Sequence, residues 1–295
     1  MAQTTRIAAI LACYNRKALT IAALEALMAQ QTEHNCAISV YLLDDGSSDG
    51  TGDAVRAAFP DAHVLEGDGS FFWNGGMRRA YSTAMETGFD FYLWLNDDTH
   101  LYPSALKNLL QTYDTLPEAS AGHILVGAVQ DPHKQTLTYG GLKRSSRWHP
   151  LKFDLLHPAE KPQECEVMHG NCVLIPRAVA EKVGNLDPHY SHAIGDIDYA
   201  LRARRAGARI WMAPGFVGTC STNSESGTWL DPQMSLTKRW KAMQGPKGLP
   251  FTEWMYFAKA HAGRMWPFFG LLPYVRLVTS AIRSVGSSKS LHPVT

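Results

Sequence analysis

The 295-residue sequence lacks a strong excess of charge of either sign. Lys and Arg number 28 and Asp and Glu number 27, which leaves a formal net charge of +1. A protein that binds nucleic acid mainly through its phosphates needs a basic surface, so this balance argues against nucleic acid as the partner. Hydrophobic residues make up 45% of the chain and charged residues 19%. That composition is typical of a packed globular protein rather than a disordered or fibrous one.

The sequence also lacks paired cysteines. It contains five Cys residues, an odd number, and no C-x-x-C pair, so it predicts neither a disulfide framework nor a structural zinc site. The N-terminal apolar run is short and has no small-residue cleavage site, unlike a signal peptide. We therefore expect a cytoplasmic protein.

A long uninterrupted hydrophobic run is absent as well. The most apolar segment, residues 266–282, is interrupted by Pro267, Pro273 and Arg276, whereas a membrane-spanning helix needs about 20 clean apolar residues. Its aromatic side chains and nearby arginines would suit the surface of an anionic membrane. Packing of the segment on its own domain fits the pattern equally well, so both interpretations stand.

What the sequence does contain is an alternation of strand and helix patterns. Short apolar runs predict strands at residues 6–13, 38–43, 62–65 and 91–95. Helical spacing predicts helices at 18–28, 53–59, 75–86 and 103–113. A loop or hairpin insertion at 140–162 precedes a predicted strand at 172–175 and predicted helices at 176–183 and 195–207. Alternation of this kind is typical of an α/β fold with a mainly parallel sheet and helices on both faces.

Polar clusters follow three of the predicted strands. They are Tyr14-Asn15-Arg16 after the first strand, Asp44-Asp45 after the second and Asn96-Asp97-Asp98 after the fourth. Ligand sites in open α/β sheets form beyond the carboxyl ends of the strands, so we expect these clusters to converge on one cleft. The first strand is not followed by the G-x-G-x-x-G loop of dinucleotide-binding folds, which excludes an NAD-binding site at that position.

Asp97 and Asp98 are candidates for a divalent metal site. Mg²⁺ and Mn²⁺ prefer oxygen ligands, and neighbouring carboxylates at a strand end suit an ion bound to a phosphate-bearing substrate. A turn with an Asp capping the next helix is the alternative, but the position in the predicted cleft favours the metal. Asp44 and Asp45 can bind a base or ribose or form an Asx turn, with Asp49 capping the following helix.

Asp196 and Asp198 fall in the first turn of the predicted helix at 195–207. The helix dipole favours carboxylates there, so stabilisation of the helix would by itself explain them. Residues two apart on a helix face different directions. We therefore expect Asp196 to face the cleft and Asp198 to hold the helix or loop.

In their order, four motifs resemble those of family 2 glycosyltransferases of the GT-A fold, and the resemblance covers roughly residues 6 to 220. The motifs are Cys13-Tyr-Asn-Arg16, Leu43-Asp-Asp-Gly-Ser-Ser-Asp-Gly-Thr51, Asn96-Asp-Asp98 and the segment from Gly195 to Gly207. Residues 67–76 resemble a loop of bacterial surface-polysaccharide members, including rhamnosyltransferase-like ones. The resemblance implies an inverting, metal-dependent enzyme that moves a sugar from a nucleotide-sugar donor to a glycan or lipid-linked acceptor in polysaccharide biosynthesis.

The resemblance also implies roles for single residues. Asp196 would be the catalytic base, and Asp98 would bind Mg²⁺ or Mn²⁺. The donor would be bound by Cys13, Tyr14, Asn15, Asp44, Asp45, Asn74, Gly75 and Asp97. Two positions depart from the family pattern, because Asn96 replaces the first acid of the D-x-D motif and Gly195 replaces the Glu of the E-D motif. Cys220 stands near the position of a late metal-binding histidine, and a contribution from it, from His169 or from His192 stays open.

The expected organisation is a GT-A domain at residues 1–230, with a nucleotide-binding half at 1–115 and an acceptor half at 116–230. A helical C-terminal extension would follow at 231–295 and is the candidate for peripheral membrane contact. A sugar-phosphate nucleotidyltransferase is the alternative enzyme, although the glycine-rich, basic phosphate loop that it needs after the first strand is missing. A non-catalytic carbohydrate-binding relative is the other alternative.

Overall fold

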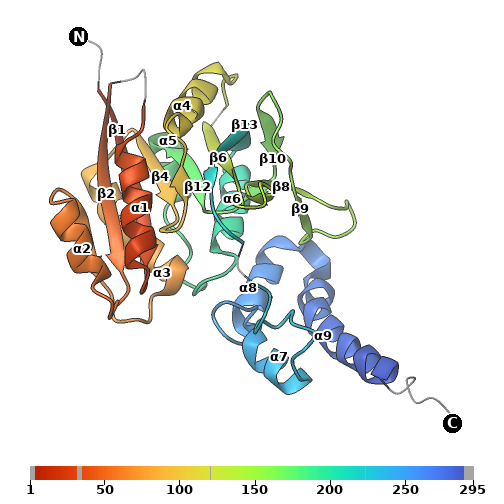
Figure 1. Ribbon diagram of the computed structural model, residues 1–295. Coiled ribbons are helices and arrows are strands. Elements are labelled where there is room, and N and C mark those ends of the chain that lie inside the picture. Colours follow the sequence, from red (N-terminus) through yellow and green to blue (C-terminus); the bar gives the residue numbers. More distant parts are fainter. Residues whose placement is uncertain (1–3, 32–34, 120, 223, 289–295) are drawn as a thin grey trace. The chain divides into compact units, whose positions relative to one another are not determined.

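The structure is a computed structural model that describes residues 4–31, 35–119, 121–222 and 224–288, with side chains described as far as Ser280 in the last helix. The chain folds into two compact units. The described parts of residues 1–145 and 153–222 form the first unit, and those of residues 146–152 and 223–295 form the second. Figure 1 labels most of the elements of both units.

The first unit is built on a sheet that contains ten strands among the described residues. Their order is β10-β13-β6-β12-β4-β1-β2-β3, with β5 paired to β13 and β7 paired to β6. The strands are β1 (Thr5–Cys13), β2 (Cys36–Asp44), β3 (His63–Glu66), β4 (Phe91–Leu95), β5 (His100–Leu101), β6 (His123–Gln130), β7 (Leu137–Tyr139), β10 (Gln163–Cys165), β12 (Cys172–Pro176) and β13 (Arg209–Thr219). Strands β3, β2, β1 and β4 are parallel, whereas β12 runs antiparallel to both β4 and β6.

Helices cover both faces of this sheet because successive side chains of a strand point to opposite faces. The helices are α1 (Lys17–Met28), α2 (Thr51–Ala58), α3 (Phe72–Thr87), α4 (Ala105–Thr115), α5 (Arg177–Val183) and α6 (Gly195–Arg205). Ile7 and Leu11 of β1 share a buried cluster with Leu24 of α1. On the other face, Gly76 of α3 lies so close to Ala12 that an added Cβ would come within 2.8 Å of it.

Aromatic rings close the face covered by α3 and α6. The ring centroid of Trp94 in β4 lies 5.7 Å from that of Tyr81 in α3 and 4.7 Å from that of Tyr199 in α6. All three rings are buried, and large buried rings contribute strongly to core stability. They hold both helices against β4, the strand that leads into Asn96.

The strands and helices predicted between residues 6 and 113 are confirmed, with small differences at their ends. The predicted hairpin insertion contains β8 (Gly141–Arg144) and β9 (Phe153–Leu155), which form a separate three-stranded sheet with β11 (Val167–Met168). The long strand β13 was not predicted. Pro214 and Gly215 interrupt its apolar pattern, and its pairing with β6 shifts register at the same place.

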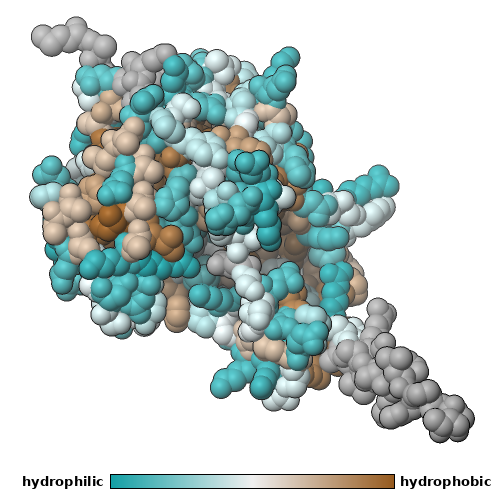
Figure 2. Space-filling model, viewed as in Figure 1, coloured by the Kyte–Doolittle hydropathy of each residue, from teal (hydrophilic) through white to brown (hydrophobic). Residues whose placement is uncertain are grey.

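The outer face of α1 is partly apolar. Leu19 is 44% exposed and Met28 is 51% exposed, and Figure 2 shows this face of α1 in tan and brown. Apolar atoms contribute much of any protein surface, so exposed residues of this kind are ordinary.

The second unit is helical, as predicted for the C-terminal extension. It contains α7 (Leu236–Met243), α8 (Phe251–His261), η1 (Gly263–Met265) and α9 (Trp266–Ser288). Pro273 lies inside α9, so this proline, expected to interrupt the segment, does not end the helix. One side of α9 is packed, because Tyr274 is buried and its hydroxyl donates to the carbonyl of Leu249 at 2.8 Å. Among the described helices none is long and apolar enough to cross a membrane.

Candidate active site

Asp97 and Asp98 lie in the loop after β4, and a single guanidinium binds them both. Nη1 of Arg16 lies 3.1 Å from Oδ1 of Asp97 and 2.6 Å from Oδ2 of Asp98. Because β1 and β4 are parallel neighbours, the loops that follow them meet at the same edge of the sheet. The sequence predicts Arg16 in the polar cluster after the first strand but assigns it no role at the site.

The two acids of this pair differ in burial. The side chain of Asp97 is 8% exposed and that of Asp98 is 20% exposed. Burial raises the pKa of the Asp97 carboxyl to about 7, and the Arg16 guanidinium opposes this rise. Oδ1 of Asp98 accepts a hydrogen bond from the Cys220 thiol, whose Sγ lies 3.4 Å away. Burial raises the pKa of Cys220 to about 12, so this thiol is protonated at neutral pH.

A second series of contacts leads from the acid pair to α6. Oδ1 of Asn96 accepts a hydrogen bond from the indole Nε1 of Trp73 at 2.8 Å. The ring of Trp73 lies against Gly170, where an added Cβ would come within 2.5 Å of the ring. The backbone N–H of Gly170 donates to Oδ2 of Asp196 at 2.9 Å. The loop that holds Asp98 and the start of α6 are therefore joined in one network of contacts.

Asp196 and Asp198 have different surroundings. Asp198 is buried, and its carboxylate lies 2.7 Å from Nε of Arg202 and accepts a hydrogen bond from the Tyr190 hydroxyl at 3.2 Å. Asp196 is half-buried. Burial raises the pKa of its carboxyl, and the neighbouring His169 imidazole opposes the rise. Asp198 thus has structural partners, whereas Asp196 is a carboxylate of raised pKa within the network.

Backbone strain is concentrated around this network. Among the described residues four non-glycine residues have a positive φ, and three of them are Asn15 at 51°, Phe72 at 51° and Ile194 at 60°. Ile194 is the sharpest case because a β-branched residue rarely adopts this conformation, and it directly precedes the helix that carries Asp196. Strain of this kind costs about 1–3 kcal/mol per residue and clusters at functional sites.

Asp44, the last residue of β2, and Asp45, which follows it, both bind backbone groups. Asp44 accepts the N–H of Gly52 in the first turn of α2 at 2.9 Å. Asp45 accepts the N–H groups of Gly69 and Phe72 at 2.9 and 2.8 Å. Asp44 also accepts the N–H of Ser47 at 3.0 Å, as expected for a turn, whereas the partners of Asp45 lie beyond β3. A contact of either carboxylate with the donor stays a prediction. Both carboxylates fix the loops at the ends of β2 and β3.

Three further predicted donor residues come from the end of β1. Tyr14 is 55% exposed. Oδ1 of Asn15 accepts the backbone N–H groups of Ser48 and Asp49 at 2.7 and 3.3 Å, so it joins the loops after β1 and β2. The side chain of Cys13 belongs to the buried core, so a ligand at this position would meet its backbone.

Asn74, another predicted donor residue, is fully buried in the first turn of α3. Its Nδ2 donates to the carbonyls of Asp187 and Tyr190 at 3.0 and 2.7 Å, and its Oδ1 faces Gly195. A contact between this side chain and a nucleotide would require the loop before α6 to move. Gly75, its neighbour, faces the ring of Phe71, with ordinary van der Waals space for a methyl group.

The two histidines left open by the sequence lie near the start of α3 and of α6. Nδ1 of His192 accepts the backbone N–H of Trp73 at 3.3 Å. Burial lowers the pKa of His169, whose Nδ1 is buried without a hydrogen-bond partner. His169 acts on Asp196, because its imidazole opposes the rise of that carboxyl's pKa.

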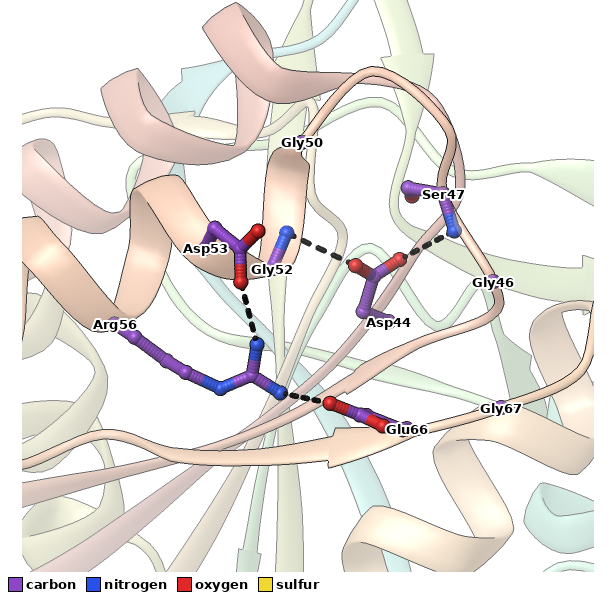
Figure 3. Close-up of a pocket in the computed structure, with 9 residues that line it drawn as sticks. All are labelled: Asp44, Gly46, Ser47, Gly50, Gly52, Asp53, Arg56, Glu66 and Gly67. Carbon is purple, nitrogen blue, oxygen red and sulfur yellow. Dashed lines mark hydrogen bonds and ion pairs between the residues drawn. The ribbon is translucent and has the colours of Figure 1, made fainter.

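A cavity of about 250 Å³ opens at the ends of β2 and β3 (Figure 3). Arg56 crosses it and pairs with Asp53 at 3.1 Å and with Glu66 at 2.7 Å. Of the predicted site residues, Asp44 lines this cavity, and its carboxylate points toward the N–H groups of the loop. The network that holds Asp98 and Asp196 lies outside it.

The fold is that of GT-A glycosyltransferases. Residues 5–242 match the family described as "Glycosyltransferase like family 2". The chain therefore belongs to glycosyltransferase family 2, which confirms the family named from the sequence motifs.

Comparison with individual proteins agrees with this assignment. The N-acetylglucosaminyl-diphospho-decaprenol L-rhamnosyltransferase of Mycobacterium tuberculosis is 25% identical over 198 residues, which are 60% of this chain and 63% of that protein's length. The mannosyltransferase PcManGT of Pyrobaculum calidifontis, solved with GDP-Man and Mn²⁺, superposes with a TM-score of 0.56 at 15% identity. The superposition covers 99% of this chain and 77% of the PcManGT chain. TarS 1–349 of S. aureus, solved with UDP-GlcNAc, gives 0.54 at 14% identity, with 90% and 73% covered. These likenesses confirm the GT-A fold.

Proposed function

We propose that the protein is an inverting glycosyltransferase that moves a sugar from a nucleotide-sugar donor to a glycan or lipid-linked acceptor in polysaccharide biosynthesis. The observation that carries the proposal is the network that joins the acid pair after β4 to Asp196 through Trp73 and Gly170. The name of the M. tuberculosis relative, an L-rhamnosyltransferase acting on a decaprenol-linked sugar, supports a lipid-linked acceptor.

Inverting transfer is a single in-line displacement. The acceptor oxygen forms a bond to the anomeric carbon while the bond from that carbon to the diphosphate oxygen breaks, and the diphosphate leaves with the electron pair. The proton of the acceptor hydroxyl passes to Asp196, because burial raises the pKa of this carboxyl and makes it a stronger base than an ordinary aspartate. The N–H groups of Gly170 and Ile197 bind its two oxygens at 2.9 and 2.8 Å and orient it.

The acid pair fits a divalent metal ion that is held jointly with a diphosphate. Mg²⁺ in phosphate-transferring sites is commonly bound by one or two carboxylates together with substrate oxygens. In the part of the chain that the structure describes, no three His, Cys, Asp or Glu side chains form a metal-binding group, so Asp98, with Asp97 beside it, would share the ion with the donor. Bound Mg²⁺ or Mn²⁺ would supply neutralisation of the charge on the leaving diphosphate.

The transfer itself tests this function. Purified protein with Mn²⁺ should release nucleoside diphosphate from one member of a nucleotide-sugar panel, and faster with a polyprenyl-diphosphate-linked sugar present. Nuclear magnetic resonance of the product should show inverted anomeric configuration. Binding of a nucleotide sugar with no diphosphate release over hours would instead favour the non-catalytic relative, and synthesis of a nucleotide sugar from a sugar 1-phosphate would favour the nucleotidyltransferase.

We also propose that the protein acts at the cytoplasmic face of a membrane, which it meets through α9. Four apolar residues recur at helical spacing on the unburied side of this helix and are 41–56% exposed: Phe268, Leu271, Val275 and Val278. Arg264 and Arg276 are exposed nearby. An apolar stripe beside cations suits the interface of an anionic membrane. None of the five cysteines is in a disulfide, which fits the reducing cytoplasm.

Vesicle flotation tests the membrane contact. The variant Leu271→Glu/Val275→Glu places two charges in the stripe, and Thr252→Glu/Ala260→Glu places two charges on exposed positions of α8 as a matched control. Wild type and control should float with anionic vesicles, and the stripe variant should stay in the dense fraction. Equal flotation of wild type and stripe variant, or no flotation of the wild type, would contradict the proposal.

A further inference from the structure

Arg16 is placed to compete with a metal ion for Asp98. Its Nη1 lies 2.6 Å from Oδ2 of Asp98, and the other oxygen, Oδ1, accepts the thiol of Cys220 at 3.4 Å. Both oxygens of the proposed metal ligand are thus already engaged by side chains of the chain itself. A divalent ion bound at Oδ2 competes with the guanidinium there, because two cations on one carboxylate oxygen repel each other at close range.

The Arg16 guanidinium is also able to leave this position. Its side chain is 34% exposed, and the guanidinium is held by hydrogen bonds from Nη1 to Asp97 and Asp98. A guanidinium offers five donors in a planar arrangement that matches phosphate oxygens, and it binds phosphate in a bidentate manner. A donor diphosphate shared between the ion and this loop would therefore give the released guanidinium a new partner.

We propose that Arg16 makes metal binding depend on the nucleotide: its guanidinium holds Asp98 against a free divalent ion and moves to the diphosphate when ion and donor bind together. This inference rests on the proposed function, because it takes Asp98 as the metal ligand. It follows that the free protein binds Mn²⁺ weakly and that nucleoside diphosphate strengthens Mn²⁺ binding. By thermodynamic linkage, Mn²⁺ strengthens nucleotide binding by the same factor.

The test measures Mn²⁺ binding directly, by calorimetry or by the electron paramagnetic resonance signal of free Mn²⁺, with no turnover required. Mn²⁺ is titrated alone and then with saturating UDP, GDP or dTDP. Removal of the competing cation in Arg16→Gln should tighten binding of Mn²⁺ alone by about 10-fold or more, the order expected for one charge-assisted hydrogen bond. The strengthening by diphosphate should shrink by a similar factor.

Two further variants separate the causes. Arg16→Lys keeps the charge and loses the planar array of donors, so binding of Mn²⁺ alone should stay as weak as in the wild type while the effect of diphosphate falls. Arg209→Gln removes an exposed arginine whose Nη2 pairs with Glu164 at 2.8 Å, and it should change neither quantity. Circular dichroism shows whether each variant is folded.

The outcomes separate this inference from the function on which it rests. If the wild type binds Mn²⁺ with diphosphate and Arg16→Gln binds Mn²⁺ alone no more tightly than the wild type, the role of Arg16 is refuted and the metal site stands. If the wild type binds no Mn²⁺ with any of the diphosphates, both the metal site and the role of Arg16 are refuted.

Discussion

The side chain of Asn74 fills the space in which residue 195 would otherwise carry a side chain. A Cβ added to Gly195 would collide with Oδ1 of Asn74, an oxygen that is buried and accepts no hydrogen bond. Nδ2 of the same side chain holds two carbonyls of the loop before α6. The glycine that replaces the Glu of the family's E-D motif is therefore matched to its neighbour on α3.

Gly195→Ala should lower the free energy of unfolding by about 1–3 kcal/mol, because the methyl group is forced into a packed site. Urea denaturation measures this cost. The double variant Asn74→Ala/Gly195→Ala should lose less free energy of unfolding than the two single variants lose together, since removal of the amide makes room for the methyl group. Additive costs would show that the two positions are not coupled.

Asp196→Asn should reduce transfer by about 10²- to 10⁴-fold, because the amide keeps the shape of the carboxylate and cannot take the acceptor proton. Donor affinity should change little. Steady-state kinetics with one donor and one acceptor checks both quantities. A rate near that of the wild type would remove Asp196 from the mechanism.

Asp198→Asn is the matched comparison for that variant and should act on stability. Asp198 is buried against Arg202, and loss of one partner of a buried pair leaves an uncompensated charge that costs about 3–5 kcal/mol. Denaturant unfolding should therefore show a large loss for Asp198→Asn and a small one for Asp196→Asn. If Asp198→Asn stays stable and instead loses the larger share of turnover, the roles of the two acids are exchanged.

Asp98→Ala should abolish the dependence of nucleotide binding on metal while the fold survives, because this carboxylate lies at the surface of the site rather than in the core. Calorimetry of nucleoside diphosphate binding with and without Mn²⁺ measures the effect. Asp154→Ala, at an exposed position of β9, should leave the dependence unchanged. Retention of the metal effect in Asp98→Ala would refute its assignment as the ligand.

Asp97 should make the protein less stable as the pH rises. Its pKa is about 7 in the folded protein against an ordinary value of 3.8, so between these values the folded state binds more protons than the unfolded chain. The contribution of Asp97 is fully present below about pH 4 and is lost as the pH rises through about 7. Urea denaturation without metal at pH 5 and pH 8 should show a smaller decline in Asp97→Asn than in the wild type. Equal declines would mean that Asp97 is ionised throughout.

The strands and helices could be predicted where a regular spacing of apolar residues ends at a cluster of polar residues. Strands β1, β2 and β4 are apolar runs closed by polar clusters, so their positions and the mainly parallel sheet could be predicted from the sequence. Strand β13 was not predicted because Pro214 and Gly215 interrupt the apolar pattern of its sequence. Such a bulge is fixed by pairing with β6, which is a long-range contact.

The candidate site, too, could be predicted only in part. Topology predicts that residues at the ends of parallel strands meet, and Arg16 and Asp98 do meet there. The local sequence does not determine which hydrogen-bond partner a side chain takes. The carboxylate of Asp44 accepts hydrogen bonds from backbone N–H groups, although the hydroxyls of a ribose could donate to it equally well. The packing of Trp73 on Gly170 depends on an approach across nearly a hundred residues and leaves no pattern along the chain.

Strand β12 lies between β4 and β6 and is antiparallel to both. It connects the strands from the first hundred residues with those from the later part of the chain. The acid loop lies at this junction, where the backbone N–H of Asn96 donates to the carbonyl of Asn171 at 3.1 Å. The loops proposed to bind the donor come from the first hundred residues, and the residues that face them come from the second half. Because the hydrogen bond of Asn96 ties the acid loop to the residue that precedes β12, a shift of β12 would be transmitted to the loop that holds Asp98.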